Sequence, residues 1–210
     1  VLPPLRARRD DIPPLIERFW REATRGDPSA PLLAALPPPA LALLTGAKRG
    51  EMVADFCAGA GGKTLALGAA MRNTGRLYAF DISGHRLAGI KPRLARSGLS
   101  NVYPVQIAHE RDDRIKRLAG KLDRVLVDAP CSGLGTLRRS PDLKWRQTPE
   151  SVQQLSAKQA AILASAARLL KPGGRLVYAT CSLLQAENEV VVQDFNAGPE
   201  GAFRALPALH

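Results

Sequence analysis

After residue 51 the chain alternates between short apolar runs and longer stretches that are predicted to be helical. Each apolar run is bounded by Gly, Asp or Pro, which is typical of strands buried in a parallel sheet. The runs cover residues 52–56, 77–80, 102–107, 125–127 and 176–179. The helical stretches cover residues 63–71, 84–97, 111–119 and 151–170, and a Lys-Pro-Gly-Gly stop follows the last of them. This alternation predicts an α/β fold with a doubly wound, mostly parallel sheet.

The first 46 residues differ from the rest because they are rich in proline. Proline fixes φ and removes a backbone donor, so only short helices are expected there, one of them at residues 40–44. We therefore expect an N-terminal segment at residues 1–46 and a single domain at residues 47–210. The last expected helix ends before residue 195, and a turn is expected at 196–201.

The chain carries 30 Lys and Arg against 19 Asp and Glu, a net charge of +11. This excess favours a polyanionic partner such as nucleic acid, although a genome that favours Arg would produce it too. The three cysteines are widely spaced, which fits neither a disulfide framework nor a zinc site. No apolar run approaches 18 residues and no signal peptide opens the sequence. We expect a cytoplasmic protein without metal or membrane contacts, and the composition leaves its oligomeric state open.

A glycine-rich turn follows the first expected strand, with the sequence DFCAGAGGKT at residues 55–64. Glycines at such a turn let a ligand approach the backbone, and the next helix presents free N–H groups. The spacing does not match a phosphate-binding P-loop. Asp81 ends the second strand, where a carboxylate can bind ribose hydroxyls, or it could be a helix cap in place of Ser83. The pattern favours a nucleoside cofactor but does not separate a dinucleotide from S-adenosylmethionine.

Two cysteines follow neighbouring strands of the expected sheet. Cys131 lies in DAPCSG at residues 128–133, after the fourth strand, and Cys181 lies in TCS after the fifth. Ligand sites of open parallel sheets lie beyond the carboxyl ends of the strands, so both thiols are expected near the cofactor. A single buried cysteine is usually a small apolar residue. Two at strand ends, one beside Asp128, favour chemistry instead.

These motifs together resemble the RNA cytosine-5 methyltransferase family, close to its bacterial 16S ribosomal RNA branch. The resemblance covers residues 48–196 and rests on DFCAGAGGK (55–63), Asp81, DAPCSG (128–133), RRSPDLKW (138–145), KPGGRLVYATCS (171–182) and EN (187–188). It implies the Rossmann-like fold of class I S-adenosylmethionine-dependent methyltransferases, with S-adenosyl-L-methionine as cofactor and RNA, expected to be ribosomal RNA, as partner.

The resemblance also implies a mechanism. Cys181 is the expected nucleophile, adding to carbon 6 of cytosine so that carbon 5 can take the methyl group. Cys131 is expected to help remove the carbon 5 proton, Asp128 to hold the polar edge of cytosine, and Lys63 to orient the base or that carboxylate. The implied cofactor site comprises Cys57, Ala58, Gly59, Ala60, Gly61, Gly62, Lys63, Asp81 and Asp128.

RNA contacts are expected in the basic segment that carries the aromatic ring of Trp145. Its candidates for RNA binding are Arg138, Arg139, Lys144 and Trp145. Cations can bind phosphates there while the ring stacks on a base, but a charged surface loop with Trp145 packed inward explains the segment equally well. The basic residues of the 84–97 stretch, Arg86 among them, are interpreted as a solvated helix face. The contact to adenine, near His109, Glu110 and Asp112, is left unassigned.

The sequence departs from the family in three places. Ala60 replaces a common proline, residues 1–46 resemble a fragment of a sigma-54 activator ATPase domain without its nucleotide-binding loop, and the last two strands are expected to be missing. Their loss would expose a sheet edge near Cys181. The alternatives are a non-catalytic remnant that binds S-adenosylmethionine or RNA, and a regulatory fragment of an activator, which the two thiol motifs argue against. Methylation of an exocyclic amine would need no thiol.

Overall fold

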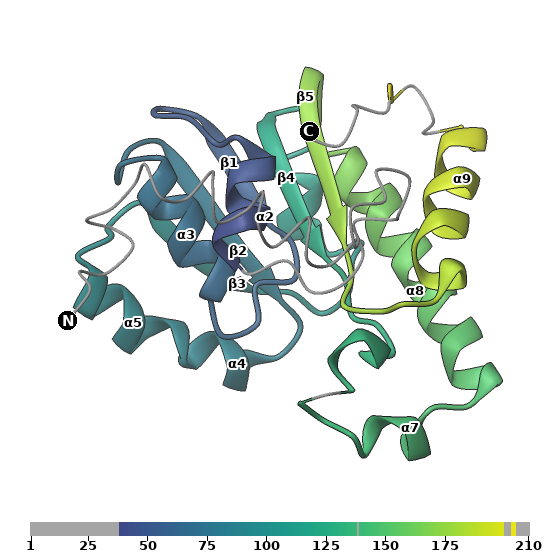
Figure 1. Cartoon of the computed structure of the whole chain (residues 1–210). Coiled ribbons are helices and arrows are strands. Elements are labelled where there is room, and N and C mark those ends of the chain that lie inside the picture. The colour runs from purple at the N-terminus through teal and green to yellow at the C-terminus, as the bar shows by residue number, and fades with distance from the viewer. Residues whose placement is uncertain (1–37, 138, 200–202, 205–210) are drawn as a thin grey trace, which may run out of the picture.

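The computed structural model describes residues 38–137, 139–199 and 203–204, and its core is a five-stranded parallel sheet (Figure 1). The strands are β1 (Met52–Asp55), β2 (Arg76–Asp81), β3 (Val102–Gln106), β4 (Leu122–Asp128) and β5 (Leu170–Ala179), in the order β3-β2-β1-β4-β5. This confirms the α/β, doubly wound prediction. The chain runs outward from β1 to β3 and then returns to β4, so the switch point of the sheet lies between β1 and β4.

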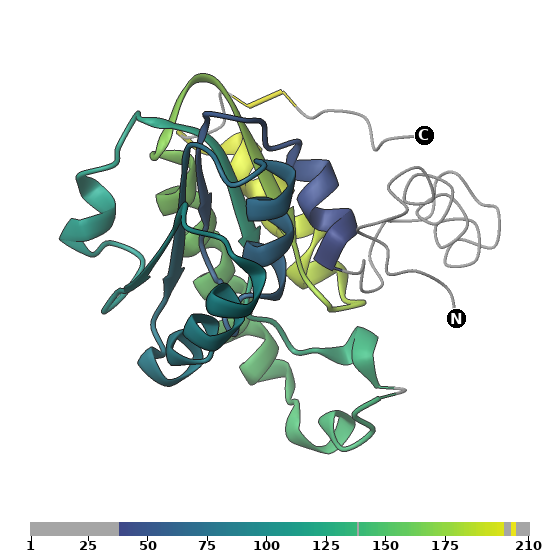
Figure 2. The same ribbon diagram turned by 90° about the vertical axis from the view of Figure 1, so that its left-hand side faces the viewer.

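Helices cover both faces of the sheet. They are α2 (Pro38–Thr45), α3 (Gly62–Ala70), α4 (Gly84–Ala88), α5 (Ile90–Ser97), α6 (Asp113–Lys116), α7 (Leu143–Arg146), α8 (Pro149–Ala167) and α9 (Glu189–Ala197), with 3-10 turns η3 (Leu134–Thr136) and η4 (Gln185–Glu187). Side chains of α2 to α5 pack in one apolar cluster, whereas those of α6 and α8 pack in the other. The segment that carries α7 projects away from the sheet (Figure 2).

The helix predicted at residues 84–97 is two helices, α4 and α5, because of Pro92. A continuous helix would need a donor from residue 92 to the carbonyl of Ala88, and proline has none. The helix is interrupted at Gly89, whose N–H donates to the carbonyl oxygen of Arg86. Pro92 falls in the first turn of α5, where no backbone donor is required. The helix predicted at 111–119 shrinks to α6, because Asp112 caps its start.

The end of the helix predicted at residues 151–170 is also wrong. Thr148 and Ser151 form a capping box at its start, and α8 ends at Ala167. Leu170 already pairs with Leu122 of β4, and the next register pair is Arg124 with Arg175. The Lys-Pro-Gly-Gly segment is therefore a bulge inside β5, not a turn before it. The turn predicted from residue 196 begins later too, because α9 continues to Ala197.

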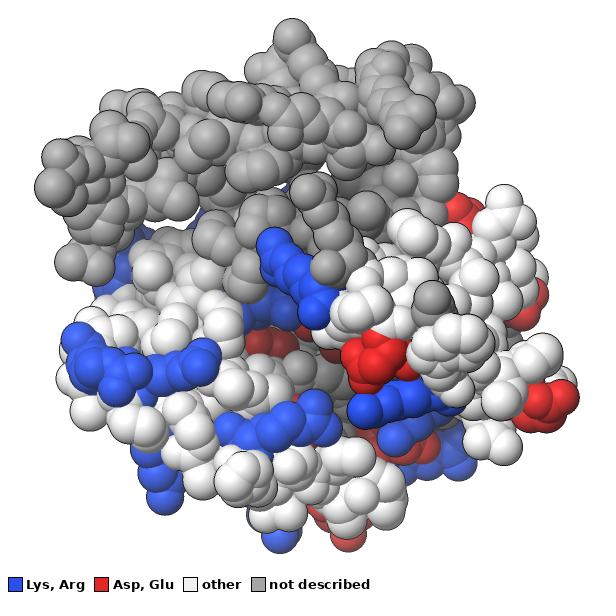
Figure 3. All heavy atoms as spheres, turned by 60° about the horizontal axis from the view of Figure 1, so that its bottom comes forward, with Lys and Arg blue, Asp and Glu red and all other residues white. Residues whose placement is uncertain are grey.

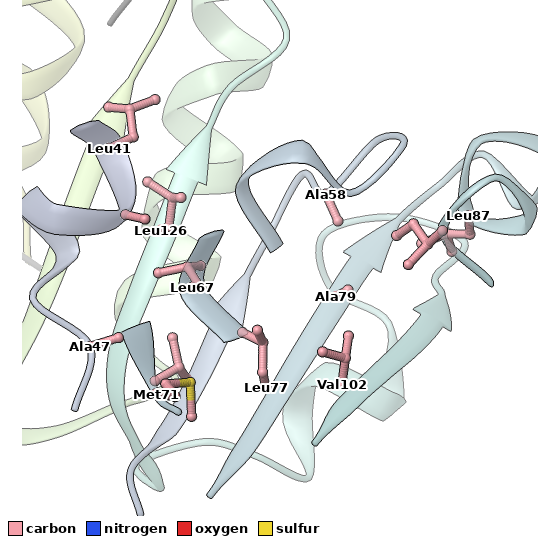
Figure 4. Close-up of a cluster of buried hydrophobic side chains, with 13 residues drawn as sticks. Leu41, Ala47, Ala58, Leu67, Met71, Leu77, Ala79, Leu87, Val102 and Leu126 are labelled. Atoms are coloured by element: carbon pink, nitrogen blue, oxygen red, sulfur yellow. The ribbon is translucent and has the colours of Figure 1, made fainter. Parts of the chain in front are cut away.

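The short helix predicted at residues 40–44 is confirmed as α2, and it belongs to the packed core. Leu41 is only 5% exposed and lies in the cluster with Leu67 and Leu126 (Figure 4). Arg124 donates to the carbonyl oxygen of Thr45 at 3.0 Å, and Arg175 donates to that of Leu44 at 3.2 Å. Arginines of β4 and β5 thus satisfy the last carbonyls of α2, which have no partner inside the helix.

Within the described residues the sheet ends at β5, and no sixth or seventh strand follows it. Most of β5 is half-buried, unlike the fully buried centre of β4. Residues 1–37, the bulk of the predicted N-terminal segment, lie outside the described part of the chain, as do residues 200–202 and 205–210. No helix in the described residues is long and apolar enough to cross a membrane.

The packing of α2 predicts a difference between two leucines of the same helix. Leu41→Ala leaves a cavity in the core and is expected to lower the free energy of unfolding by about 2 to 4 kcal/mol. Leu43→Ala, at a position 42% exposed, should cost under about 1 kcal/mol. Urea unfolding followed by circular dichroism measures both. Equal effects would show that α2 is not part of the folded core.

Candidate active site

The carboxyl ends of the central strands meet at one edge of the sheet, and a cavity of about 390 Å³ lies there. Asp55, Asp81 and Asp128 are the last residues of β1, β2 and β4, and Cys181 follows β5 closely. Figure 3 shows that this face is hollowed and that Lys and Arg side chains lie at several points around the hollow. Lys63, Arg86 and Lys158 are the cations among the lining residues.

The glycine-rich turn forms one wall of this cavity. Most predicted cofactor residues line it: Cys57, Ala58, Gly59, Ala60, Gly62, Lys63, Asp81 and Asp128. Gly61 is not among the lining residues. It precedes α3 with φ of 86°, and a Cβ there would come within 2.9 Å of Ile90 Cγ1. Its requirement for glycine is therefore explained by backbone conformation and by the approach of α5.

Asp81 faces the cavity and is held by backbone donors. It accepts hydrogen bonds from Gly59 N at 2.8 Å and from Ser83 N at 2.7 Å, and Arg86 lies 3.5 Å from its carboxylate. Ser83, not Asp81, caps α4 by accepting from Arg86 N. The alternative explanation of Asp81 as a helix cap is therefore wrong, and its carboxylate is oriented as a binding group.

Asp55 lies beneath the turn and is fully buried. Thr64 donates to one of its oxygens at 2.7 Å, while the other has no partner among the described residues. Burial raises the pKa of Asp55 to about 6, because removing a carboxylate from water disfavours its charge. This hydrogen bond links the end of β1 to the first turn of α3, and so fixes the shape of the glycine turn between them.

The two predicted thiols lie in contact. Cys131 Sγ is 3.2 Å from Cys181 Sγ, and both residues line the cavity. A hydrogen bond from Cys131 lowers the pKa of Cys181 to about 7. The same contact, followed by burial, raises the pKa of Cys131 far above its ordinary value. The shift directions favour Cys181 as the more acidic thiol of the pair and Cys131 as its hydrogen-bond donor.

The charged pair of the site is Lys63 with Asp128. Lys63 Nζ forms an ion pair with Asp128 Oδ2 from opposite sides of the cavity, α3 and the end of β4. Each side chain is about a quarter exposed. Three chain segments therefore bring the Cys181 thiol, an ammonium and a carboxylate to one cavity. Such a set can bind a polar heterocycle, attack it and neutralise the charge that develops.

Comparison with known proteins identifies the family of this chain. Residues 42–200 match the family model described as 16S rRNA methyltransferase RsmB/F. The chain belongs to the 16S rRNA methyltransferase RsmB/F family. It is 42% identical over 145 residues to a probable ribosomal RNA small subunit methyltransferase B of Synechocystis, an alignment that covers 69% of this chain and 32% of that protein. The chain thus spans about a third of the length of that relative.

Two solved structures are similar to this chain in three dimensions. NSun6 from Pyrococcus horikoshii with SFG has a TM-score of 0.69 at 32% identity, covering 76% of this chain and 40% of that one. A methyltransferase homologue from the same organism has a TM-score of 0.66 at 37% identity, covering 75% and 48%. The family resemblance and the Rossmann-like class I methyltransferase fold expected from the sequence are both confirmed.

The cavity fits S-adenosylmethionine, the cofactor that family membership and these neighbours support. A glycine turn before a helix, a carboxylate held by two backbone donors, and apolar walls match the methionine, ribose and adenine parts of that molecule. The apolar lining comes from Phe56, Ile82, Ile107, Ala129 and Ile162. In the described residues, no group of three or more His, Cys, Asp and Glu side chains could hold a metal ion.

The structure also separates the residues near the unassigned adenine contact. Glu110 lines the cavity, whereas Asp112 caps α6 and His109 Nδ1 accepts from Arg111 N. Arg86 is exposed, as the interpretation of a solvated helix face expected, and it also borders the cavity beside Asp81. Lys158 was missed. It lies four residues before Ile162 on α8, and that helical spacing was the signal that could have paired them on one face.

Arg139 and Trp145, the predicted RNA-binding residues whose side chains the structure describes, lie on the projecting segment, outside the cavity lining. Trp145 is 80% exposed, so the alternative in which it packs inward is wrong. Arg139 is exposed as well. Arg138 and the side chain of Lys144 lie outside the described residues. The side chain of Gln147, just after α7, connects this segment to the loop that carries Cys131, because its Nε2 donates to the carbonyl oxygen of Ser132 at 3.1 Å.

Gly135 packs closely against the backbone of Cys181. Its N–H donates to the carbonyl oxygen of Cys181 at 2.8 Å, and a Cβ at Gly135 would lie 2.5 Å from the same oxygen. We expect Gly135→Ala to lower the free energy of unfolding by about 1 to 3 kcal/mol, as overpacking does. Gly198→Ala is the control, since a Cβ there meets only ordinary contacts of 3.4 and 3.5 Å. Urea unfolding of both variants tests this, and equal stability would contradict the close approach.

The thiol pair predicts a pH dependence that can be measured without substrate. Cys181 should react with iodoacetamide with a midpoint near pH 7. In Cys131→Ala the hydrogen bond to the thiolate is lost, so the midpoint should rise toward the ordinary value of about 8.5. Alkylation at pH 7 should then slow about tenfold, as read by peptide mass spectrometry. Cys57, whose pKa burial raises strongly, serves as the internal unreactive control. An unchanged midpoint would show that Cys131 does not stabilise the thiolate.

Proposed function

We propose that this site transfers a methyl group from S-adenosylmethionine to carbon 5 of a cytosine in RNA, through a covalent bond between Cys181 and carbon 6. The observation that carries the proposal is the thiol pair at the cavity, with Cys181 favoured as the thiolate. Methyl transfer to an exocyclic amine needs no thiol nucleophile. The relatives are named as ribosomal RNA methyltransferases, and we infer ribosomal RNA as the substrate class of this chain too.

In the proposed reaction the Cys181 thiolate attacks carbon 6 and pushes electron density onto carbon 5. The bound cofactor supplies an electrophilic methyl group, which carbon 5 takes. Cys131 gives its own proton to solvent after the addition and then accepts the carbon 5 proton. The electrons of the carbon 5–hydrogen bond restore the ring double bond, and the bond between Cys181 and carbon 6 breaks with its electron pair leaving on sulfur. Asp128 and Lys63 lie beside the thiols and are assigned to the polar edge of cytosine, where charge develops during the addition.

The pKa asymmetry of the thiols fits both halves of this sequence. The contact with Cys181 is the largest cause of the raised pKa of Cys131. Once Cys181 is bonded to carbon 6 it no longer carries a charge, so this cause disappears, the pKa of Cys131 falls and its thiol can ionise. The contact that favours Cys181 as the thiolate thus keeps Cys131 protonated until the addition has taken place, and only then is Cys131 free to accept a proton.

The cofactor is assigned to the wall formed by residues 57–60, 62 and 63, with Asp81 at the ribose hydroxyls. Glu110 is the side chain that we assign to the polar edge of adenine, because it is the carboxylate of the 109–112 stretch that lines the cavity. RNA is assigned to the projecting segment. There the exposed Arg139 would meet phosphates, and the exposed ring of Trp145 would stack on a base.

A mechanism-based trap tests the proposal. RNA that contains 5-fluorocytidine, incubated with cofactor, should form a covalent adduct with the wild-type chain, because fluorine cannot leave as a proton does. Cys181→Ala should form none. Cys131→Ala should accumulate an adduct even on ordinary cytidine, since removal of the carbon 5 proton is blocked. Denaturing gels read all three.

The outcomes of this experiment separate the two functions that the sequence leaves open. Loss of the adduct in Cys181→Ala alone supports the covalent mechanism. Cofactor binding by calorimetry without any adduct would favour a non-catalytic module that binds S-adenosylmethionine. Full activity of Cys181→Ala would exclude Cys181 as the nucleophile.

A further inference from the structure

A buried carboxylate lies directly behind the thiol pair. Glu187, in the turn η4 that follows β5, is 0% exposed. One of its oxygens accepts from Ser132 N at 2.8 Å and from Gln159 Nε2 at 3.0 Å, and the other accepts from Ser132 Oγ at 2.5 Å. Three donors therefore meet one carboxylate, away from water, where hydrogen bonds to charged groups are strongest.

These donors belong to the loops that carry the thiols. Ser132 adjoins Cys131, and its hydroxyl lies 3.1 Å from that of Ser182, which adjoins Cys181. Gln159 of α8 also donates to the carbonyl oxygen of Pro130, on the other side of Cys131, at 2.9 Å. The carboxylate thus joins the loop after β4, the loop after β5 and the middle of α8 at one point.

Glu187 does not itself line the cavity, and its hydrogen bonds go to the neighbours of the cysteines, not to their sulfur atoms. Any effect of Glu187 on the two thiols therefore acts through the loops that carry them. We propose that Glu187 is a positioning residue that holds the loops in the register at which Cys131 donates to Cys181. This rests on the proposed function for its catalytic meaning, but the register itself can be tested without RNA.

A carboxylate suits this position better than an amide. All three groups that face it are arranged as donors, and an ionised carboxylate only accepts. In Glu187→Gln one side-chain atom would become a donor facing Ser132 Oγ, so the serine would have to turn its hydrogen elsewhere. Its remaining partner is Ser182 Oγ, which accepts from Leu184 N. The substitution keeps volume but disturbs the connection between the loops.

Positioning and simple electrostatics predict opposite changes in the pKa of Cys181. Removing a buried negative charge would by itself favour the thiolate and lower that pKa. Losing the register would remove the hydrogen bond from Cys131 and raise it. The groups that face Cys181 are Cys131 and Asp128 from the end of β4 and Lys63 from α3. None of them is altered in Glu187→Gln, so the direction of the change identifies the cause.

The experiment measures the pH profile of Cys181 alkylation by iodoacetamide in the full chain. In Glu187→Gln the midpoint should rise by at least about one pH unit, with alkylation about tenfold slower at pH 7 and equal to wild type at pH 10. Glu189→Gln is the matched control. Glu189 begins α9 two residues away, and its Oε2 has no hydrogen-bond partner among the described residues. The midpoint of Cys181 alkylation in Glu189→Gln should stay at the wild-type value.

An unchanged or lowered midpoint in a folded Glu187→Gln variant, with only a lower melting temperature, would overturn the proposal. If that variant does not fold, Ser132→Ala decides. It removes one donor from Glu187 and the link to Ser182 while leaving the carboxylate buried with its other donors, and its midpoint should also rise. No rise in Ser132→Ala would overturn the proposal too. A raised midpoint in these variants, with no RNA adduct from the wild-type chain, would support the positioning and reject the proposed reaction.

Discussion

The site depends on a constraint of parallel sheets, namely that all strands end at the same edge. Val53, Ala54 and Leu126 are fully buried in the central strands β1 and β4, so the positions where these strands end are fixed by the core. The glycine turn, Asp81, Asp128 and the two thiol loops follow from there. Each of them lies at the cavity because it follows the carboxyl end of a strand, where ligand sites of parallel sheets are found. The positions of the site residues are therefore set by the apolar packing of the strands that carry them.

A second layer of polar contacts converts that placement into a defined geometry. The Sγ–Sγ contact of 3.2 Å lies between two loops, and loops are the mobile part of such folds. Here they are tied by Ser132, Ser182, Gly135 and Glu187, all buried or nearly so. Leaving one such buried partner unsatisfied costs about 1 to 3 kcal/mol, which makes a shifted loop unfavourable. The contact between the two thiols is thus framed by hydrogen bonds from residues outside the cavity lining.

The sequence predicted the strands, the sheet class, the family and most of the cavity lining, because these depend on local patterns and specific motifs. It predicted less well where helices stop. Pro92 and the bulge at Lys171–Gly174 were visible in the sequence, but their effect depends on pairing with other segments. Glu110 was left unassigned, Lys158 was missed and Arg86 was not expected at the cavity for the same reason, since only the folded arrangement shows which side chains border it. Glu187 was seen as a motif residue without a role, because its partner Ser132 is 55 positions away.

The packing of α2 has a consequence for the limits of the folded unit. Compositionally, the chain changes near residue 46, and a biochemist trimming it to a minimal fragment would cut there. Such a cut would remove Leu41 and its neighbours from the core, and it would leave Arg124 and Arg175 without the carbonyl groups that they now bind. Two guanidinium groups and an open apolar groove over β4 and β5 would then face solvent. The smallest stable fragment must therefore include the helix on the proline-rich side of the compositional boundary.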